Sequence, residues 1–143
     1  MWSAASVLAC ALSVLGRSEA SMPPNELVEI APPGVSVNAE AFVLQGRRTI
    51  YLITSSRAFR EASGNSDCGY SDATRKLASI LAHEEWHVKH GSDEKGAYEW
   101  QLLTLLRLGL TPGTGVYREV QVSMIKVLDA RKRERPDRVL ASR

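Results

Sequence analysis

The stretch from Ala73 to about His90 carries the strongest periodic pattern of the chain and constrains its fold most. Asp72 precedes it as a candidate N-cap, and Gly91 follows it as a residue that ends helices. One stripe at helical spacing consists of Leu77, Leu81, Glu84 and Val88. We therefore predict an amphipathic helix that buries this stripe and places one carboxylate in it.

The order of the remaining patterns indicates an α+β domain. The β-rich runs 41–44 and 49–54 are separated by a short polar gap and predict a β-hairpin. A short helix through Ala62, capped by Ser55 or Ser56, follows them. After the main helix, patterns for two more helices end near Leu108 and Arg133. We expect a hairpin or small sheet packed against three main helices.

Size and charge exclude several classes of protein. With 143 residues the chain has the length of one domain. Its net charge is +2, and residues 126–143 hold seven basic and three acidic side chains, so the rest of the chain is slightly acidic. A body without clustered basic residues does not bind nucleic acid. We interpret residues 134–143 as a solvated basic tail, and two cysteines are too few for a thiolate metal site.

The N-terminal residues resemble an export segment. Residues 2–16 are uncharged and apolar but too short to span a bilayer. We predict residues 1–20 to be a signal peptide, or a lipoprotein-type segment in which a lipidated Cys10 gives membrane association; the alternative is an apolar helix kept in the mature protein. The expected localisation is secreted, periplasmic or lipid-anchored.

Four prolines make residues 21–34 a predicted linker, with at most one short strand at 27–30. The folded domain is then expected over residues 35–133.

The sequence His83-Glu84-Glu85-Trp86-His87 has the pattern His-Glu-x-x-His inside the predicted main helix. Four helical residues advance about 6 Å and slightly more than one turn, so both imidazoles lie on one face. Two imidazoles at this spacing are typical of a zinc site.

Only one of the two glutamates suits a catalytic base. Glu84 lies on the apolar stripe, where a carboxylate is unfavourable unless it is paired or close to a cation. Glu85 shares its face with Ala78, Ala82 and Lys89, and its spacing to Lys89 is typical of an exposed helix pair. We predict Glu84 as the base and expect Glu85 to be exposed.

A third metal ligand is expected on the next helix, because Gly91 lets the chain reverse. Glu94 lies on the inward stripe of that helix, and Glu99 is the alternate. Asp93 and Glu94 also suit a helix start without any metal. His90 points further along the axis and is expected to have a supporting role.

The run from Leu77 to His87, followed by Glu94-Lys95-Gly96-Ala97-Tyr98, resembles the gluzincins, zinc metallopeptidases with two histidines and a glutamate as ligands, in their smallest forms. Several such families open a Glu-x-x-Ala-Asp segment with the third ligand; Glu94 matches, and Tyr98 replaces the acidic residue. In a metzincin-like pattern Asp93 would be the ligand, but His90 stands where that pattern has glycine.

The resemblance implies a zincin-like domain with Zn²⁺ held by His83, His87 and Glu94, and peptide hydrolysis with Glu84 taking a proton from the attacking water. It also implies a peptide or protein substrate, held along an edge strand at 49–54, with Tyr98 or Tyr117 as a proton donor. Two alternatives stay open. One is a non-catalytic metal- or peptide-binding protein of the same fold, and the other is a helical interaction module with incidental histidines.

Overall fold

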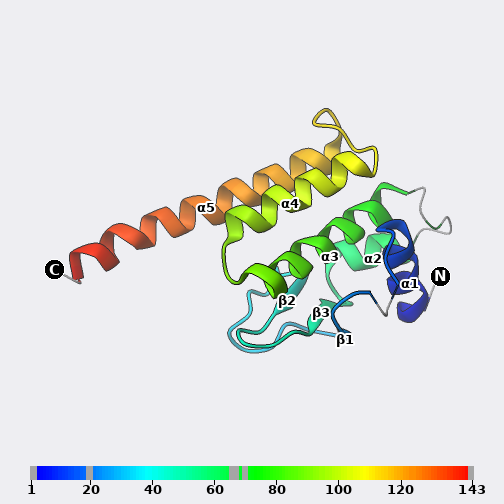
Figure 1. Ribbon diagram of the computed structural model, residues 1–143, viewed down its shortest axis with the longest axis horizontal. Coiled ribbons are helices and arrows are strands. Elements are labelled where there is room, and N and C mark those ends of the chain that lie inside the picture. Colours follow the sequence, from blue (N-terminus) through cyan, green and yellow to red (C-terminus); the bar gives the residue numbers. More distant parts are fainter. Residues whose placement is uncertain (1–2, 19–20, 65–67, 69–70, 142–143) are drawn as a thin grey trace.

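The computed structural model describes residues 3–18, 21–64, 68 and 71–141, with side chains through Lys132. These residues contain five helices and three strands (Figure 1). In chain order they are α1 (Ala4–Val14), β1 (Asn25–Val28), β2 (Ala41–Val43), β3 (Ile50–Ile53), α2 (Arg57–Ser63), α3 (Asp72–His90), α4 (Glu94–Arg107) and α5 (Gly115–Ala141). The predicted α+β class is confirmed.

The helices begin where short polar side chains can accept backbone N–H groups. Ser56 caps α2 and Asp93 caps α4, as two of the expected candidates. Ser71, rather than Asp72, caps α3 and accepts the Thr74 N–H at 3.1 Å. Helix α5 continues to Ala141, past the predicted end near residue 133 and through the segment expected to be a basic tail.

The sheet has the strand order β1-β3-β2, so β3 is the central strand. β2 and β3 form the predicted antiparallel hairpin, in which Ala41 pairs with Leu52. β1 pairs with β3 in parallel and lies at residues 25–28, two residues before the strand expected in the proline-rich segment. That segment therefore contributes to the folded domain rather than only linking to it.

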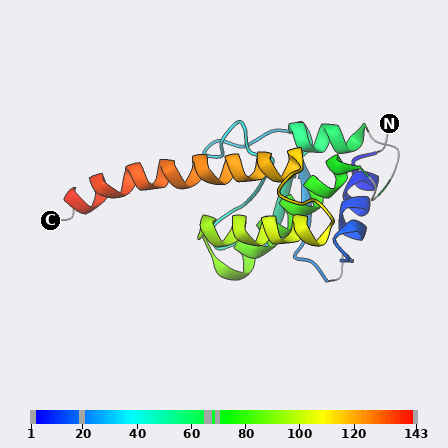
Figure 2. The same ribbon diagram turned by 90° about the horizontal axis from the view of Figure 1, so that it is seen from above.

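Helix α3 lies at the centre of the molecule. The sheet, α1, α2 and α4 all contact α3, and α5 packs on α4 (Figure 1). The far end of α5 extends well beyond the other elements in both views (Figures 1 and 2). We expected three helices on the sheet; instead α3 packs directly on it, and α4 packs on α3.

Helix α1 belongs to the main core. Val7, Ala11 and Leu12 pack in one cluster with Leu77 and Leu81 of α3. None of the described helices is long and apolar enough to cross a membrane. The export prediction for residues 1–20, of which 1, 2, 19 and 20 lie outside the described residues, stays a prediction.

A disulfide joins Cys10 of α1 to Cys68 in the connection between α2 and α3. The two Cα atoms are 5.5 Å apart, within the usual span of a disulfide. The bridge fixes α1 to the segment that leads into α3.

The expectation of an exposed Glu85 is wrong. Its side chain is 3% exposed, and Oε1 accepts a bond from Arg17 Nη2 at 3.1 Å. Lys89 Nζ lies 3.8 Å from the other carboxylate oxygen. The face of α3 that carries Ala78 and Ala82 is buried, and α1 packs on this helix, so its small residues are contacts rather than a solvent face.

We predict that Glu85→Ala lowers the free energy of unfolding by about 2 kcal/mol, because it leaves Arg17 partly buried without its carboxylate. Arg57→Ala, which breaks the exposed Arg57–Glu61 pair, should cost at most about 0.5 kcal/mol. Urea unfolding followed by circular dichroism measures both. Equal small losses would show that the Arg17–Glu85 pair does not hold α1 on α3.

Candidate metal centre

His83, His87 and Glu94 form a group that could hold a metal ion. One ligand atom from each lies within 4.8 Å of the others. Glu94 Oε1 lies 3.1 Å from His83 Nε2 and within hydrogen-bond distance of His87 Nε2. Tetrahedral zinc with bonds of about 2.0–2.1 Å separates its donors by roughly 3.4 Å. The three donors therefore need only small movements to surround one ion.

Hydrogen bonds orient both imidazoles with Nε2 towards this group. His87 Nδ1–H donates to the Gly91 carbonyl at 2.7 Å. His83 Nδ1 lies 2.8 Å from Gln101 Oε1. A bond at Nδ1 fixes the tautomer whose Nε2 carries a lone pair, which is the form that binds a metal.

The tautomer of His83 follows from a chain of side chains inside the core. Ser79 Oγ donates to the Lys76 carbonyl at 2.7 Å, so it accepts from Gln101 Nε2 at 3.2 Å. The oxygen of Gln101 then faces His83 and accepts its Nδ1–H. Gln101 and His83 are 4% and 7% exposed, so the hydrogen bonds between these side chains are largely shielded from water.

Glu94 reaches the histidines because α4 approaches α3 closely. Gly91 adopts φ 83°, a left-handed conformation that favours glycine, and ends α3. Three residues later α4 begins. A Cβ on Gly96 would lie 2.3 Å from a ring carbon of Trp86, so only glycine allows the first turn of α4 to rest on that indole.

The other candidate ligands lie elsewhere. Glu99 is exposed on α4, one position away from the stripe of Tyr98 and Gln101 that faces His83. Asp93 is exposed and accepts the Lys95 N–H as the helix cap. His90 is exposed and its ring lies 4.5 Å from that of Trp86. The structure therefore brings Glu94, and not its alternates, to the two histidines.

Glu84 is buried beside the metal group, as its place on the stripe predicts. It is 7% exposed, and no described side chain or backbone group donates a hydrogen bond to its carboxylate. Burial raises the pKa of Glu84 above its usual value, and the nearby His83 and His87 lower it to a smaller extent. A carboxylate of raised pKa next to a metal site is suited to accept a proton.

Charges within the group favour an ionised glutamate. Burial raises the pKa of Glu94, but the bonds and charges of His83 and His87 outweigh this and hold the pKa well below its usual range. Burial lowers the pKa of His87, whereas its bonds to Glu94 and Gly91 raise it more strongly. A divalent cation between these residues would replace the protons that otherwise balance Glu94.

Of the two tyrosines named from the sequence, Tyr98 lies at the site. Its ring lies 4.5 Å from that of His83, and burial raises its pKa to about 12, with Glu94 and Glu84 adding to the shift. Tyr117 instead packs against Leu105, Leu110 and Val120. Tyr98 therefore stays protonated at neutral pH and keeps a hydrogen to donate.

Two cavities open beside Glu84 and Glu94. One, of about 620 Å³, extends towards α5, and the other, of about 750 Å³, runs along β2 and the end of α3. The interpretation of the strand at 49–54 as the edge strand is wrong, because β3 pairs on both sides. β2 is the sheet edge that lines the second cavity.

Gln101 and Arg17 are the partners that sequence reasoning missed. Gln101 lies on the same helical stripe as Glu94, and a polar residue on a buried stripe is a sequence signal for a buried partner. Arg17 follows the apolar N-terminal run, and no local pattern links it to Glu85.

Comparisons with known proteins give no relative. No protein-family model, no curated protein and no solved structure matches this chain. The functional interpretation therefore rests on the residues of this chain.

We predict that Glu94→Ala weakens zinc binding by several kcal/mol, because it removes the only described carboxylate that reaches both imidazoles. Glu99→Ala, an exposed neighbour on the same helix, should bind zinc like the wild type. Competition with a chromogenic chelator measures both affinities. A collapse in Glu99→Ala with an unchanged Glu94→Ala would assign the ligand to Glu99.

Proposed function

We propose that this protein is a zinc-dependent metallopeptidase. The observation that carries the proposal is the convergence of two tautomer-fixed histidines and Glu94 beside Glu84, a buried carboxylate with no hydrogen-bond donor. Three protein ligands that leave a further position open are typical of catalytic rather than structural zinc. Two imidazoles and one glutamate carboxylate are a known ligand set of catalytic zinc.

Glu84 has the position and environment of a general base. Zinc, when bound, supplies a Lewis acid that makes water acidic near neutral pH and polarises a carbonyl. Glu84 accepts the proton as the water oxygen bonds to the peptide carbonyl carbon. The C–N bond then breaks, and the proton held by Glu84 passes to the leaving amine nitrogen.

Two further elements support a peptide substrate. Among the described strands β2 pairs only with β3. Its other edge lies along the cavity that contains Glu84 and His87, so an extended peptide can add to it by backbone hydrogen bonds. Tyr98 stays protonated beside His83 and is suited to donate a hydrogen bond to the developing oxyanion.

The alternative is a non-catalytic protein that binds a metal or a peptide at the same residues. Such a protein has no use for an unpaired carboxylate beside the metal group, because burying one costs stability. Glu84 therefore favours the catalytic proposal.

We predict that Glu84→Gln abolishes hydrolysis of an unfolded protein while zinc content stays at the wild-type level, since the amide keeps the shape but accepts no proton. Glu99→Gln, an exposed carboxylate on α4, should keep full activity. Zinc analysis and a fluorogenic casein assay test this. Full activity of Glu84→Gln would contradict its role as the base, and a wild type that binds zinc without hydrolysing anything would favour the non-catalytic alternative.

Export is part of the proposal, because a disulfide persists in oxidising compartments. The Cys10–Cys68 bridge allows export to be tested, because it can form only if the mature chain keeps Cys10 with a free thiol. Cleavage between residues 17 and 24 would remove Cys10, and lipidation would use its thiol, so each excludes the bridge from the mature chain.

Because of this bridge, we take up the alternative named from the sequence, an apolar helix kept in the mature protein, in place of a cleaved or lipidated segment. We predict that the exported protein keeps α1 and carries this disulfide. Intact-mass measurement of the native protein, before and after reduction and alkylation, would then show two alkylated cysteines only after reduction. A chain that begins between residues 17 and 24, or a lipidated Cys10, would show that α1 is absent from the mature protein.

A further inference from the structure

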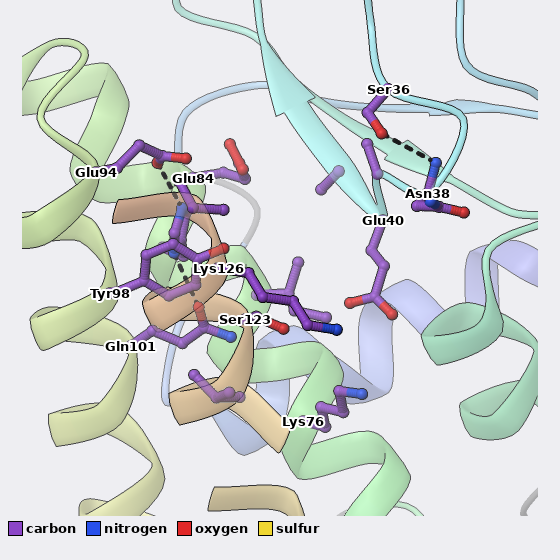
Figure 3. A pocket seen from close by; sticks show the side chains of 16 residues that line it. Ser36, Asn38, Glu40, Lys76, Glu84, Glu94, Tyr98, Gln101, Ser123 and Lys126 are labelled. Carbon is purple, nitrogen blue, oxygen red and sulfur yellow. Dashed lines mark hydrogen bonds and ion pairs between the residues drawn. The ribbon is translucent and has the colours of Figure 1, made fainter. Parts of the chain in front are cut away.

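Glu40 lies in the cavity of about 620 Å³ that also contains His83, Glu84 and Glu94, and the mechanism above does not use it. It immediately precedes β2, on the wall opposite α4. Figure 3 shows its carboxylate pointing into the space between β2, α3 and α5, across from Tyr98 and Gln101. A carboxylate in this position can meet a substrate group that extends from the metal centre.

No described cation lies within ion-pair distance of Glu40. Lys76, whose positive charge acts on Glu40, pairs with Glu119 at 2.8 Å. Lys126 enters the cavity from α5, but its side chain is exposed and forms no ion pair with Glu40. Among the described residues, the backbone N–H of Ala58 donates a hydrogen bond to the carboxylate of Glu40.

The surroundings of Glu40 favour an additional positive charge. Burial raises the pKa of Glu40, and the attraction of Lys76 and the bond from Ala58 offset this only in part. Glu119 and Glu61 raise the pKa further by their negative charges. A cationic group that enters the cavity would relieve this repulsion.

The walls of the same cavity suit an aliphatic stem. The lining of the cavity that contains the metal group and Glu40 includes apolar side chains beside its polar ones: Ala39, Ala41, Ile80, Val120 and Val127. Lysine and arginine bury their methylene chains against apolar surface and place the charge at the far end. Apolar wall residues beside Glu40, a carboxylate that no described cation pairs with, therefore match a basic side chain.

We propose that Glu40 is a specificity-determining residue that binds an ammonium or guanidinium group of the substrate next to the bond that is cut. The proposal rests on the proposed function. Lys126 lines the same cavity from an exposed position, and no described cation pairs with Glu40, so a cationic group of the substrate would displace no ion pair.

The test uses quenched fluorescent peptides that differ only in lysine, norleucine or glutamate beside the cleaved bond. The wild type should prefer lysine over norleucine by about tenfold in kcat/KM, and Glu40→Gln should reduce this ratio to about one. Glu29→Gln, an exposed carboxylate outside the cavity, should keep the wild-type ratio. N-acetylated and free-amine versions of each peptide distinguish a side-chain ammonium from the terminal amine.

A binding measurement separates this proposal from the proposed function. Glu84→Gln protein should bind the lysine peptide about tenfold more tightly than the norleucine peptide by fluorescence anisotropy, and adding Glu40→Gln should remove the difference. Binding that depends on Glu40 without hydrolysis by the wild type would overturn the peptidase proposal alone. Hydrolysis with no preference for lysine, or with a preference for glutamate, would overturn the role of Glu40 alone, and neither binding nor hydrolysis would overturn both.

The variant Glu40→Gln keeps the size of the side chain and an oxygen for the Ala58 N–H, so it should fold. If thermal unfolding shows that it does not, Lys126→Glu serves instead, because this exposed position adds a negative charge to the same cavity. The lysine-to-norleucine ratio should then rise about twofold or more. An unchanged ratio would overturn the proposal.

Discussion

The burial of α3 on nearly every side is the constraint on which the rest of the structure depends. Every residue from Leu77 to Glu85 is buried, four of them polar or charged. A polar group that is removed from water needs a partner, or its desolvation lowers stability. Ser79 and His83 find theirs in Gln101, and Glu85 finds Arg17 through one of its two carboxylate oxygens. Glu84 accepts no hydrogen bond from any described residue and lies beside the metal group. It therefore differs from the other polar side chains of this buried stretch, which have structural partners.

Much of the fold could be predicted from local patterns. The hairpin, the helix that carries the two histidines and the turn at Gly91 follow from β-branched runs, helical periodicity and a glycine stop. Glu94 could be named as the third candidate because it opens the inward stripe of α4. Its reach towards His83 could not be derived, because it depends on the close contact of Gly96 with Trp86, which is a property of two packed helices.

Local patterns could not predict the contacts between segments that are far apart in the sequence. Ala78, Ala82 and Lys89 made the face of Glu85 look solvated, since small residues and a charge pair are common on exposed helices. The same small residues allow close packing, and the helix α1 that packs on α3 lies more than sixty residues earlier. The central position of β3 in the sheet also depends on a contact between distant segments, because β1, from a proline-rich segment, pairs with β3 in parallel.

The energetics of Glu84 connect the fold to the proposed chemistry. Hydrophobic packing around Leu77 and Leu81 stabilises α3 in a position where Glu84 is largely desolvated, and no described neighbour donates a hydrogen bond to it. Exchange of this carboxylate for an apolar residue would be expected to stabilise a domain that only had to fold. The cost becomes useful where a divalent ion lies beside it, because the ion favours the ionised form while burial keeps it basic enough to take a proton from water. Glu84, whose burial on the apolar stripe lowers the stability of the fold, is therefore the residue of this helix that argues most directly for catalysis.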